Sequence, residues 1–337
     1  MRDMANGSEE FLDSVEALAE RLSRDEPKRI AIVTHKRADV DALASASALR
    51  GCILTLLPSS RVTVHSQGRL PLKSKGLVEF LGLEIVREVP AIDDSSWVAL
   101  VDSGELGTTG LSRGQLAGAK CRILVDHHPL VDQDIYDIVL HQLSTSTSEV
   151  VLEILTALRH APDEKESTAL LAGIITDTAG LKEANERTFE HMCALRSYGA
   201  EISKAWEVVY REASRGERIA KIKAAQRMKV LKSGELVVVI TEVGSFHASV
   251  ASSLVRLGAD MAVVFSDEKH GSKASLRASK RFSEVSSKSV GALSAQLGEE
   301  LGGHGGGHIR AGALSTTRST RESLSIAKEF IAKHLSQ

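Results

Sequence analysis

The sequence has little cysteine, few aromatic residues and no long apolar run. Its three cysteines, Cys52, Cys121 and Cys193, are odd in number and widely spaced, which excludes a disulfide framework and favours reduced, buried thiols. Aromatic residues make up 4% of the chain, which argues against a surface that stacks the bases of long single strands. No apolar stretch approaches the ~20 residues that span a bilayer, and the N-terminus has no signal-peptide core. We therefore expect a cytoplasmic protein without a membrane segment.

The bulk composition is that of a globular protein with two domains. A length of 337 residues exceeds what one core usually supports, and 42% hydrophobic with 26% charged residues is typical of a folded chain. The net charge of -2 is unevenly distributed, since Arg215 and the residues after it hold 19 Lys and Arg against 11 Asp and Glu. An acidic first part can bind cations, and a basic second part can bind a polyanion. An uneven distribution of charge over solvent-exposed surfaces also arises by chance.

The first part alternates apolar strands with helical patterns, which predicts an α/β fold with a parallel sheet covered on both faces. We expect strands at 30–33, 62–65, 98–101 and 123–125, and helices at about 41–57, 148–159 and 166–175.

The second part predicts a smaller α/β domain. Its expected elements are a helix at about 203–228, strands at 236–240, 262–265 and 274–277, a glycine-rich loop at 302–307 and a helix near 321–334. We accordingly expect a catalytic domain at 1–195, a helical linker at 196–228 and a substrate-binding domain at 229–337, with a cleft between the domains.

Acidic and imidazole side chains stand where the expected strands end. His35, Asp102 and Asp126 follow three of the apolar runs, and ligands in parallel sheets bind beyond the carboxyl ends of the strands. Asp39 and Asp41 follow His35 in the same turn, and two histidines follow Asp126. Mixed carboxylate and imidazole ligands suit two divalent ions, of which Mn²⁺ is favoured and Mg²⁺, Co²⁺ or Zn²⁺ are alternatives.

Each of these residues also has a structural interpretation. A single Asp at a strand end is more often a helix N-cap, and a single His is usually a surface or core residue. The co-occurrence of four such motifs in one domain favours the metal site over these interpretations.

The four motifs resemble those of the DHH-family phosphoesterases. They stand here as Thr34-His35-Lys36-Arg37-Ala38-Asp39-Val40-Asp41-Ala42, Val101-Asp102-Ser103-Gly104, Val125-Asp126-His127-His128-Pro129 and Gly173-Ile174-Ile175-Thr176-Asp177-Thr178, with a linking run Ser146-Thr147-Ser148-Glu149. The chain departs from the family pattern at Ala38, where many members have proline.

The resemblance implies a role for each motif residue. It places His35, Asp39 and Asp102 at one metal, and Asp41, Asp102, His127 and Asp177 at the other, with Asp102 as the bridge. It makes His128 a phosphate contact or general acid, and Asp126 the carboxylate that orients a histidine.

The C-terminal run from Leu301 to Gly312 resembles the signature of a DHHA1 domain, Gly-Gly-Gly-His. Glycines let backbone N–H groups approach an anion closely, although composition alone describes a flexible loop. We expect substrate contacts from Gly306, Gly307, His308 and Arg310. Arg277 resembles the DHHA1 arginine that binds substrate phosphate, and is otherwise a strand-edge cation.

The resemblance implies a nuclease of the nanoRNase type, which releases mononucleotides from short single-stranded RNA or DNA. A phosphatase for 3′-phosphoadenosine 5′-phosphate and a cyclic-dinucleotide phosphodiesterase keep the same chemistry and stay open as alternatives. An inorganic pyrophosphatase, a processive RecJ-like exonuclease and a non-catalytic nucleotide-binding module rank lower. The sequence leaves open the cleavage polarity, the physiological metal, and whether the chain is a monomer or a homodimer.

Overall fold

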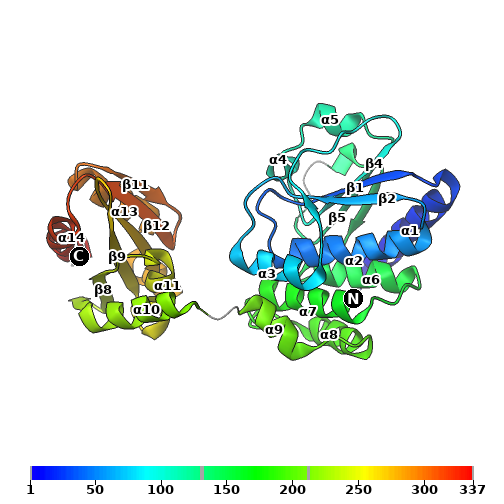
Figure 1. Cartoon of the computed structure of the whole chain (residues 1–337). Helices are drawn as coiled ribbons and strands as arrows, with labels where there is room; N and C mark the ends of the chain where they lie inside the picture. The colour runs from blue at the N-terminus through cyan, green and yellow to red at the C-terminus, as the bar shows by residue number, and fades with distance from the viewer. Residues whose placement is uncertain (1, 130–132, 211–212, 336–337) are drawn as a thin grey trace. The chain divides into compact units, whose positions relative to one another are not determined.

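The computed structural model describes residues 2–129, 133–210 and 213–335, with the backbone alone at 2–8. The chain forms two compact units, residues 1–212 and 213–337 (Figure 1). Each unit contains one sheet with helices on it, which confirms the predicted α/β class. Within the described ranges, no helix combines the length and the apolar character needed to cross a membrane.

The N-terminal unit is built on a six-stranded, fully parallel sheet in the order β3–β2–β1–β4–β5–β6. The strands are β1 Arg29–Val33, β2 Arg61–His65, β3 Ile85–Val86, β4 Ser96–Val101, β5 Cys121–Asp126 and β6 Ile138–His141. The strand order reverses between β1 and β4. In open parallel sheets, ligands bind beyond the carboxyl ends of the strands at such a reversal.

The predicted strands of this unit are all present, as β1, β2, β4 and β5. They are readable because buried parallel strands are near-continuous apolar runs, and β4 is buried at each of its six positions. The two edge strands were not predicted. β3 has two residues, and the residues of β6 alternate between buried and partly buried positions, so neither stands out as an apolar run.

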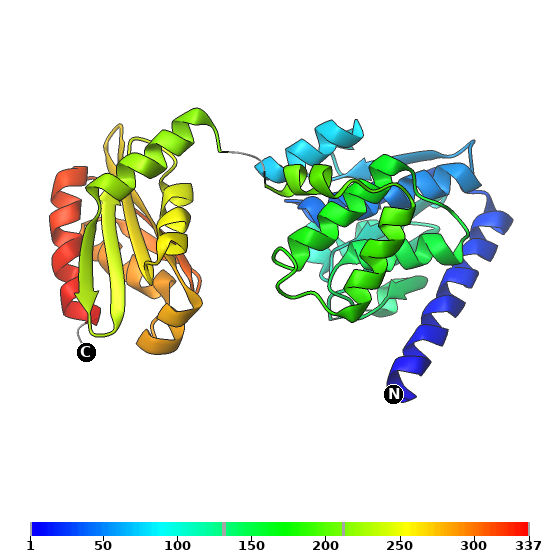
Figure 2. The ribbon, with the colours of Figure 1, turned by 90° about the horizontal axis from the view of Figure 1, so that it is seen from below.

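Helices cover both faces of this sheet (Figures 1 and 2). One face packs against α1, α2 and α6, with α7 on the outer side of α2 and α6, and the other face packs against α4, α5 and neighbouring loops. The helices are α1 Arg2–Asp25, α2 Val40–Leu56, α3 Leu72–Leu81, α4 Leu106–Thr109, α5 Arg113–Ala117, α6 Thr147–Ala157, α7 Glu164–Asp177, α8 Glu186–Ser197 and α9 Ile202–Val209. A 3₁₀ turn spans Gln133–Ile135.

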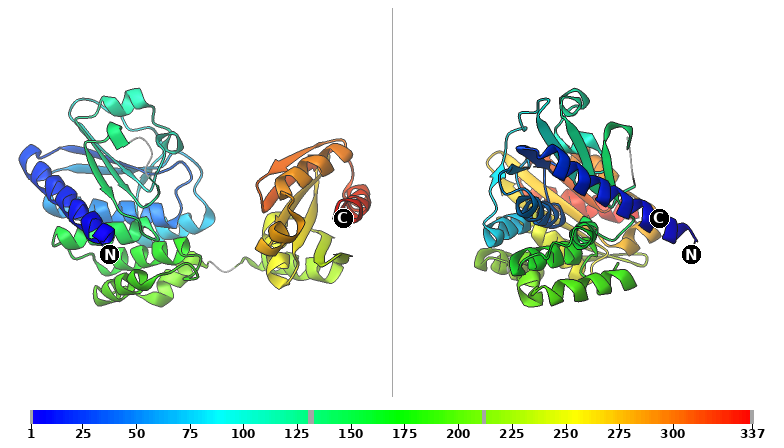
Figure 3. Two further views of the ribbon diagram at one scale, coloured as in Figure 1. Left: turned by 180° about the vertical axis from the view of Figure 1, so that it is seen from behind. Right: turned by 90° about the vertical axis from the view of Figure 1, so that its right-hand side faces the viewer.

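The C-terminal unit contains a six-stranded mixed sheet in the order β11–β12–β10–β9–β8–β7, in which only β8 and β9 pair in parallel. The strands are β7 Lys229–Ser233, β8 Leu236–Glu242, β9 Met261–Glu268, β10 Gly271–Ala278, β11 His304–Gly307 and β12 Ala311–Thr316. Helices α10 and α11 pack on one face, and α13 and α14 on the other (Figure 3). The helices are α10 Arg215–Arg227, α11 His247–Leu257, α12 Lys280–Ser286, α13 Val290–Glu300 and α14 Thr320–Leu335.

The glycine-rich run is not a loop, as the sequence had suggested, because His304–Gly307 form the edge strand β11. The glycines permit a close approach of helix α13. A Cβ on Gly305 would lie 2.1 Å from the carbonyl oxygen of Ser294, and a Cβ on Gly298 would lie 2.7 Å from the backbone nitrogen of Gly305. The run is therefore glycine-rich in part because a strand and a helix touch there through their backbones.

The segment 196–228, predicted as a helical linker, contains the end of α8 and two separate helices, α9 and α10. Ala205, Val208 and Val209 of α9 are buried in the core of the N-terminal unit. Ala224 of α10 is buried in the C-terminal unit. The division between the units falls between these two helices.

Candidate metal centre

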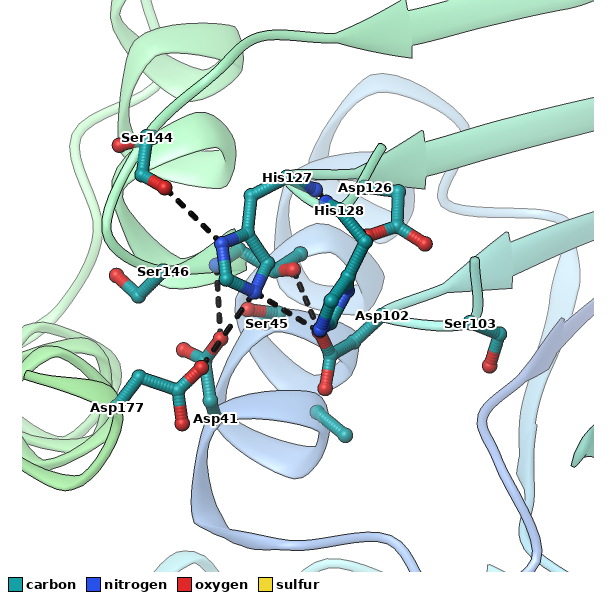
Figure 4. A network of polar contacts seen from close by, with 12 residues as sticks. Asp41, Ser45, Asp102, Ser103, Asp126, His127, His128, Ser144, Ser146 and Asp177 are labelled. Atoms are coloured by element: carbon teal, nitrogen blue, oxygen red, sulfur yellow. Dashed lines mark hydrogen bonds and ion pairs between the residues drawn. The ribbon is translucent and has the colours of Figure 1, made fainter. Parts of the chain in front are cut away.

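The residues of the four N-terminal motifs meet at the carboxyl end of the parallel sheet (Figure 4). The turn between β1 and α2 provides His35 and Asp39, and the first turn of α2 provides Asp41. The ends of β4 and β5 provide Asp102 and the run 126–128, and the last residue of α7 is Asp177. The meeting point is the reversal of strand order between β1 and β4.

One group of potential ligands consists of His35, Asp39 and Asp102. One ligand atom from each lies within 4.8 Å of the others. Nε2 of His35 is 4.0 Å from Oδ1 of Asp39 and 3.9 Å from Oδ2 of Asp102. Oδ1 of Asp39 also accepts a hydrogen bond of 3.1 Å from the backbone N–H of Ala42, so this aspartate is a helix N-cap as well.

A second group consists of Asp41, His127 and Asp177, whose ligand atoms also lie within 4.8 Å of one another. Nε2 of His127 is 3.5 Å from Oδ2 of Asp177 and 3.8 Å from Oδ1 of Asp102. Asp102 therefore presents one oxygen to each group. Its backbone has φ of 56°, a left-handed conformation that is rare for a non-glycine residue and occurs often at functional sites.

Two of the potential ligand atoms are buried and have no hydrogen-bond partner among the described residues, as expected for atoms that bind a cation. Nδ1 of His127 lies 3.1 Å from the carbonyl oxygen of Ser144 and donates to it, so in the neutral ring Nε2 is the nitrogen with the lone pair. This Nε2 is buried and has no hydrogen-bond partner among the described residues, and the same holds for Oδ2 of Asp126. Buried polar atoms normally have a partner, and two orphaned donor atoms beside a carboxylate cluster fit a metal centre.

The carboxylates repel one another and are buried. Burial first, and then repulsion from neighbouring carboxylates, raise the pKa of Asp41 and Asp102 to about 7 and that of Asp177 to about 10. Burial lowers the pKa of His35, which keeps its imidazole neutral. Divalent cations would compensate the negative charge and hold all three carboxylates ionised.

Asp126 and His128 form a pair that, together with Asp102 and His127, makes a third and overlapping group of potential ligands. Oδ1 of Asp126 accepts a hydrogen bond of 2.8 Å from Nδ1 of His128, and further bonds from the backbone N–H groups of His127 and His128. Burial acts to raise the pKa of Asp126, but the hydrogen bonds from His128 outweigh it and lower this pKa. The bond to Asp126 raises the pKa of His128 to about 8, so this half-exposed imidazole carries a proton at neutral pH.

The N-terminus of α6 holds the carboxylates in place, a role that the sequence did not reveal. The backbone N–H of Thr147 donates to Asp41 over 2.7 Å, and that of Ser148 donates to Asp41 over 3.0 Å. The hydroxyl of Thr147 donates to Oδ1 of Asp102 over 2.8 Å. The run 146–149 stood out in the sequence, but only the fold shows which carboxylates it contacts.

The residues predicted to contact substrate lie in the C-terminal unit. His308 and Arg310 are exposed and line an open hollow of about 600 Å³ together with Gly307. Gly306 precedes them in β11 and has no atom near its Cβ position, so its α-carbon faces open space. The backbone N–H of His308 donates to the carbonyl of Ala311, so this donor is occupied within the hairpin.

Arg277 is partly buried on β10, directly opposite Ala311 of β12. Its Nη1 lies 2.9 Å from the carbonyl of Leu276 and 3.4 Å from that of Gly312. The other guanidinium nitrogens have no hydrogen-bond partner among the described residues. Since Ala311 lines the hollow, Arg277 is placed near its edge.

Comparisons with known proteins agree with this architecture. The sequence model of the DHH family, N-terminal domain, matches residues 29–174. The chain is 33% identical over 310 residues to an uncharacterized protein of Methanocaldococcus jannaschii, and the match covers 88% of this chain and 89% of that one.

Solved structures share the fold at low sequence identity. A crystal structure of an exopolyphosphatase-related protein from Bacteroides fragilis has a TM-score of 0.68 at 17% identity, covering 95% of this chain and 96% of that one. The exonuclease RecJ bound to manganese has a TM-score of 0.52 at 15% identity, covering 96% and 94% of the two chains.

Proposed function

Because the chain belongs to the DHH family of phosphoesterases, we propose that it is a metal-dependent phosphodiesterase that hydrolyses short oligonucleotides and releases nucleoside monophosphates. The observation that carries the proposal is the pair of ligand groups joined through Asp102, with a protonated His128 next to them. Two adjacent cation sites beside a positioned acid suit the hydrolysis of a phosphate ester.

The proposed ligands of one ion are His35, Asp39 and Asp102, and those of the other are Asp41, Asp102, His127 and Asp177. Manganese is the proposed ion, with Mg²⁺ and Co²⁺ as substitutes, because the donor set mixes imidazole and carboxylate. When bound, such ions lower the pKa of a water molecule and stabilise negative charge on a phosphate. The manganese in the RecJ structure with this fold supports the proposal.

His128 is the proposed general acid. Asp126 holds its Nδ1–H, which fixes the ring orientation and keeps the imidazole protonated at neutral pH. The other ring nitrogen is then the one that can donate a proton to the leaving oxygen. Asp126 itself is 0% exposed, and its role is to orient and charge His128 rather than to meet substrate.

The C-terminal unit supports a nucleotide substrate. His308 and Arg310 line one open hollow, and Arg277 lies on β10 opposite Ala311, which also lines it. We propose that these three side chains and the backbone at Gly306 and Gly307 bind a phosphate of the oligonucleotide. The low aromatic content favours a short substrate over a long single strand.

The test is a comparison of substrates with the purified full chain and Mn²⁺, with EDTA as the metal-free control. RNAs of two to five nucleotides should be shortened to mononucleotides, and the variants Asp102→Ala and His128→Ala should lose this activity. Turnover of 3′-phosphoadenosine 5′-phosphate or cyclic di-AMP alone would assign the chain to one of the two alternative phosphoesterase activities. Binding of nucleotides without hydrolysis of any ester would leave only the non-catalytic module.

A further inference from the structure

A buried acid and a histidine outside the candidate ligand groups brace the loop on which those groups depend. We propose that Glu149, held by His191, is a positioning residue that fixes residues 144–148 and, through them, His127, Asp41 and Asp102. The inference rests on the metal centre proposed above. It assigns a function to two residues that touch neither the candidate ions nor the substrate.

Glu149 binds the loop that precedes it. Its Oε2 accepts hydrogen bonds from the backbone N–H groups of Thr145 and Ser146, at 2.9 and 3.2 Å, and from the hydroxyls of Ser144 and Thr145. Its own backbone N–H donates to the hydroxyl of Ser146, which completes a capping box at the start of α6. Four donors on one carboxylate oxygen fix the path of the loop.

The loop that Glu149 holds forms hydrogen bonds with residues of both ligand groups. The carbonyl of Ser144 accepts the Nδ1–H of His127, which leaves Nε2 of that ring for a cation. Three residues later, Thr147 donates to Asp41 through its backbone and to Asp102 through its hydroxyl. A displacement of the loop would therefore disturb a ring tautomer and two carboxylates together.

His191 of α8 holds Glu149 from the opposite side. Its Nδ1 lies 3.3 Å from Oε1 of Glu149, and its Nε2 lies 2.9 Å from Oε1 of Glu153. Burial acts against the charge on both partners, yet their hydrogen bonds lower the pKa of Glu149 to about 2 and raise that of His191 to about 9. The pair is thus ionised throughout the neutral range, so its two charges can compensate each other in the protein interior.

Glu153 offers a matched control. It lies one turn further along α6, contacts the same His191, and also pairs with Arg187 over 2.6 Å. Within the described part of the chain, its side chain forms no hydrogen bond or ion pair with residues 144–148. Substitution of Glu153 thus removes a similar charge and a similar contact to α8 without releasing the loop.

The experiment measures Mn²⁺ binding to the full chain by calorimetric titration, together with the ¹⁵N shifts of His127 in the metal-free protein. We expect Glu149→Ala to weaken Mn²⁺ binding by ~10-fold to ~100-fold, because it releases Ser144 and Thr147, and the loss of such outer partners of metal ligands usually has this effect. The His127 spectrum should change from one Nδ1–H tautomer to a mixture. Glu149→Gln keeps one acceptor oxygen and should recover part of the affinity, and Glu153→Ala should stay within ~3-fold of the wild type.

Two results would overturn the inference: wild-type affinity and tautomer in Glu149→Ala, or an equal loss in Glu153→Ala. Glu149→Gln and His191→Asn give the same test if the alanine variant does not fold. The readouts need no substrate, so a wild type that binds Mn²⁺ but hydrolyses nothing contradicts the proposed function alone. A wild type that binds no Mn²⁺ contradicts both.

Discussion

Nδ1 of His128 and Oδ1 of Asp126 are joined by a hydrogen bond of 2.8 Å, and Asp126 is fully buried whereas the side chain of His128 is half exposed. The pair therefore presents a charged, oriented imidazole at the surface of the site. The positive charge of His128 is stabilised by the buried carboxylate of Asp126.

The first prediction concerns the pH dependence of hydrolysis. If His128 is the acid, kcat should fall as the pH rises above about 8, because the imidazole loses its proton there. Asp126→Asn should move this limb to lower pH, toward the ordinary pKa of histidine. His128→Ala should remove the limb and lower kcat by ~100-fold to ~10,000-fold. A pH–rate profile with Mn²⁺ held saturating checks this, and an unchanged limb in His128→Ala would exclude the histidine as the acid.

The second prediction concerns the number of ions. Calorimetric titration should show two Mn²⁺ per chain in the wild type. His35→Ala should abolish one binding event, since His35 belongs to one group only. Asp102→Ala should weaken both events, because its two oxygens face different groups. His304→Ala, an exposed histidine in the other unit, serves as the control and should bind like the wild type.

The third prediction concerns stability without metal. The pKa of Asp177 is raised in the folded state, so its contribution to stability is present at low pH and is lost as the pH rises toward about 10. Asparagine resembles the protonated form, and Asp177→Asn should therefore melt at a temperature about 3 °C or more above the wild type at pH 8 in EDTA. The difference should close toward pH 4, where the unfolded aspartate is also protonated.

Added Mn²⁺ should reverse this order, because only the wild type gains the full stabilisation by bound ligand. Thermal melts at several pH values, with EDTA and with Mn²⁺, measure both effects. Equal melting temperatures of the two metal-free proteins at every pH would contradict the raised pKa.

The fourth prediction concerns the C-terminal unit. Arg277→Ala should raise KM for a short RNA while kcat changes little, and it should reduce the salt dependence of binding by about one phosphate contact. Arg281→Ala is the control, since Arg281 pairs with Glu235 on the surface and is not among the proposed contacts. Steady-state kinetics at three salt concentrations distinguish the two, and equal effects of both variants would indicate a nonspecific charge effect.

The fifth prediction separates two neighbouring glycines. Gly305→Ala places a Cβ 2.1 Å from the carbonyl of Ser294, so helix α13 must move and the free energy of unfolding should fall by ~1–3 kcal/mol. Gly306→Ala meets nothing within 4 Å and should change stability by less than ~1 kcal/mol. Urea unfolding of the two variants measures the contrast. Similar losses in both would mean that backbone freedom, rather than close packing, explains the glycines.

Several features could be predicted from the sequence because they depend on local pattern. The central strands are apolar at nearly every position, as β4 shows, and such runs stand out from any background. Helix α6 was expected at about 148–159, and it spans Thr147–Ala157 because Ser146 and Glu149 form a capping box at its start. The edge strands β3 and β6 lack such a pattern, because β3 has only two residues and β6 alternates between buried and partly buried positions.

The candidate ligands were predicted from their order along the chain and from the family resemblance. The structure brings them close together in three overlapping groups, one of which also contains Asp126 and His128. The residues that hold them could not be found in this way. Ser144, Thr147 and His191 become relevant only when α6 packs on the sheet and α8 packs on α6 and α7, and no spacing in the sequence encodes those contacts.

The sequence by itself determined the chemistry of this protein, because the types and order of its polar residues at the ends of apolar runs specify a mixed carboxylate and imidazole donor set. Only the tertiary structure decided how those donors are used. Crossover connections bring the ends of β1, β4 and β5 together, bury Asp102 between two groups and place the start of α6 against Asp41. Distances, orphaned atoms and shifted pKa values arise from that packing, since each depends on neighbours that are remote in the chain.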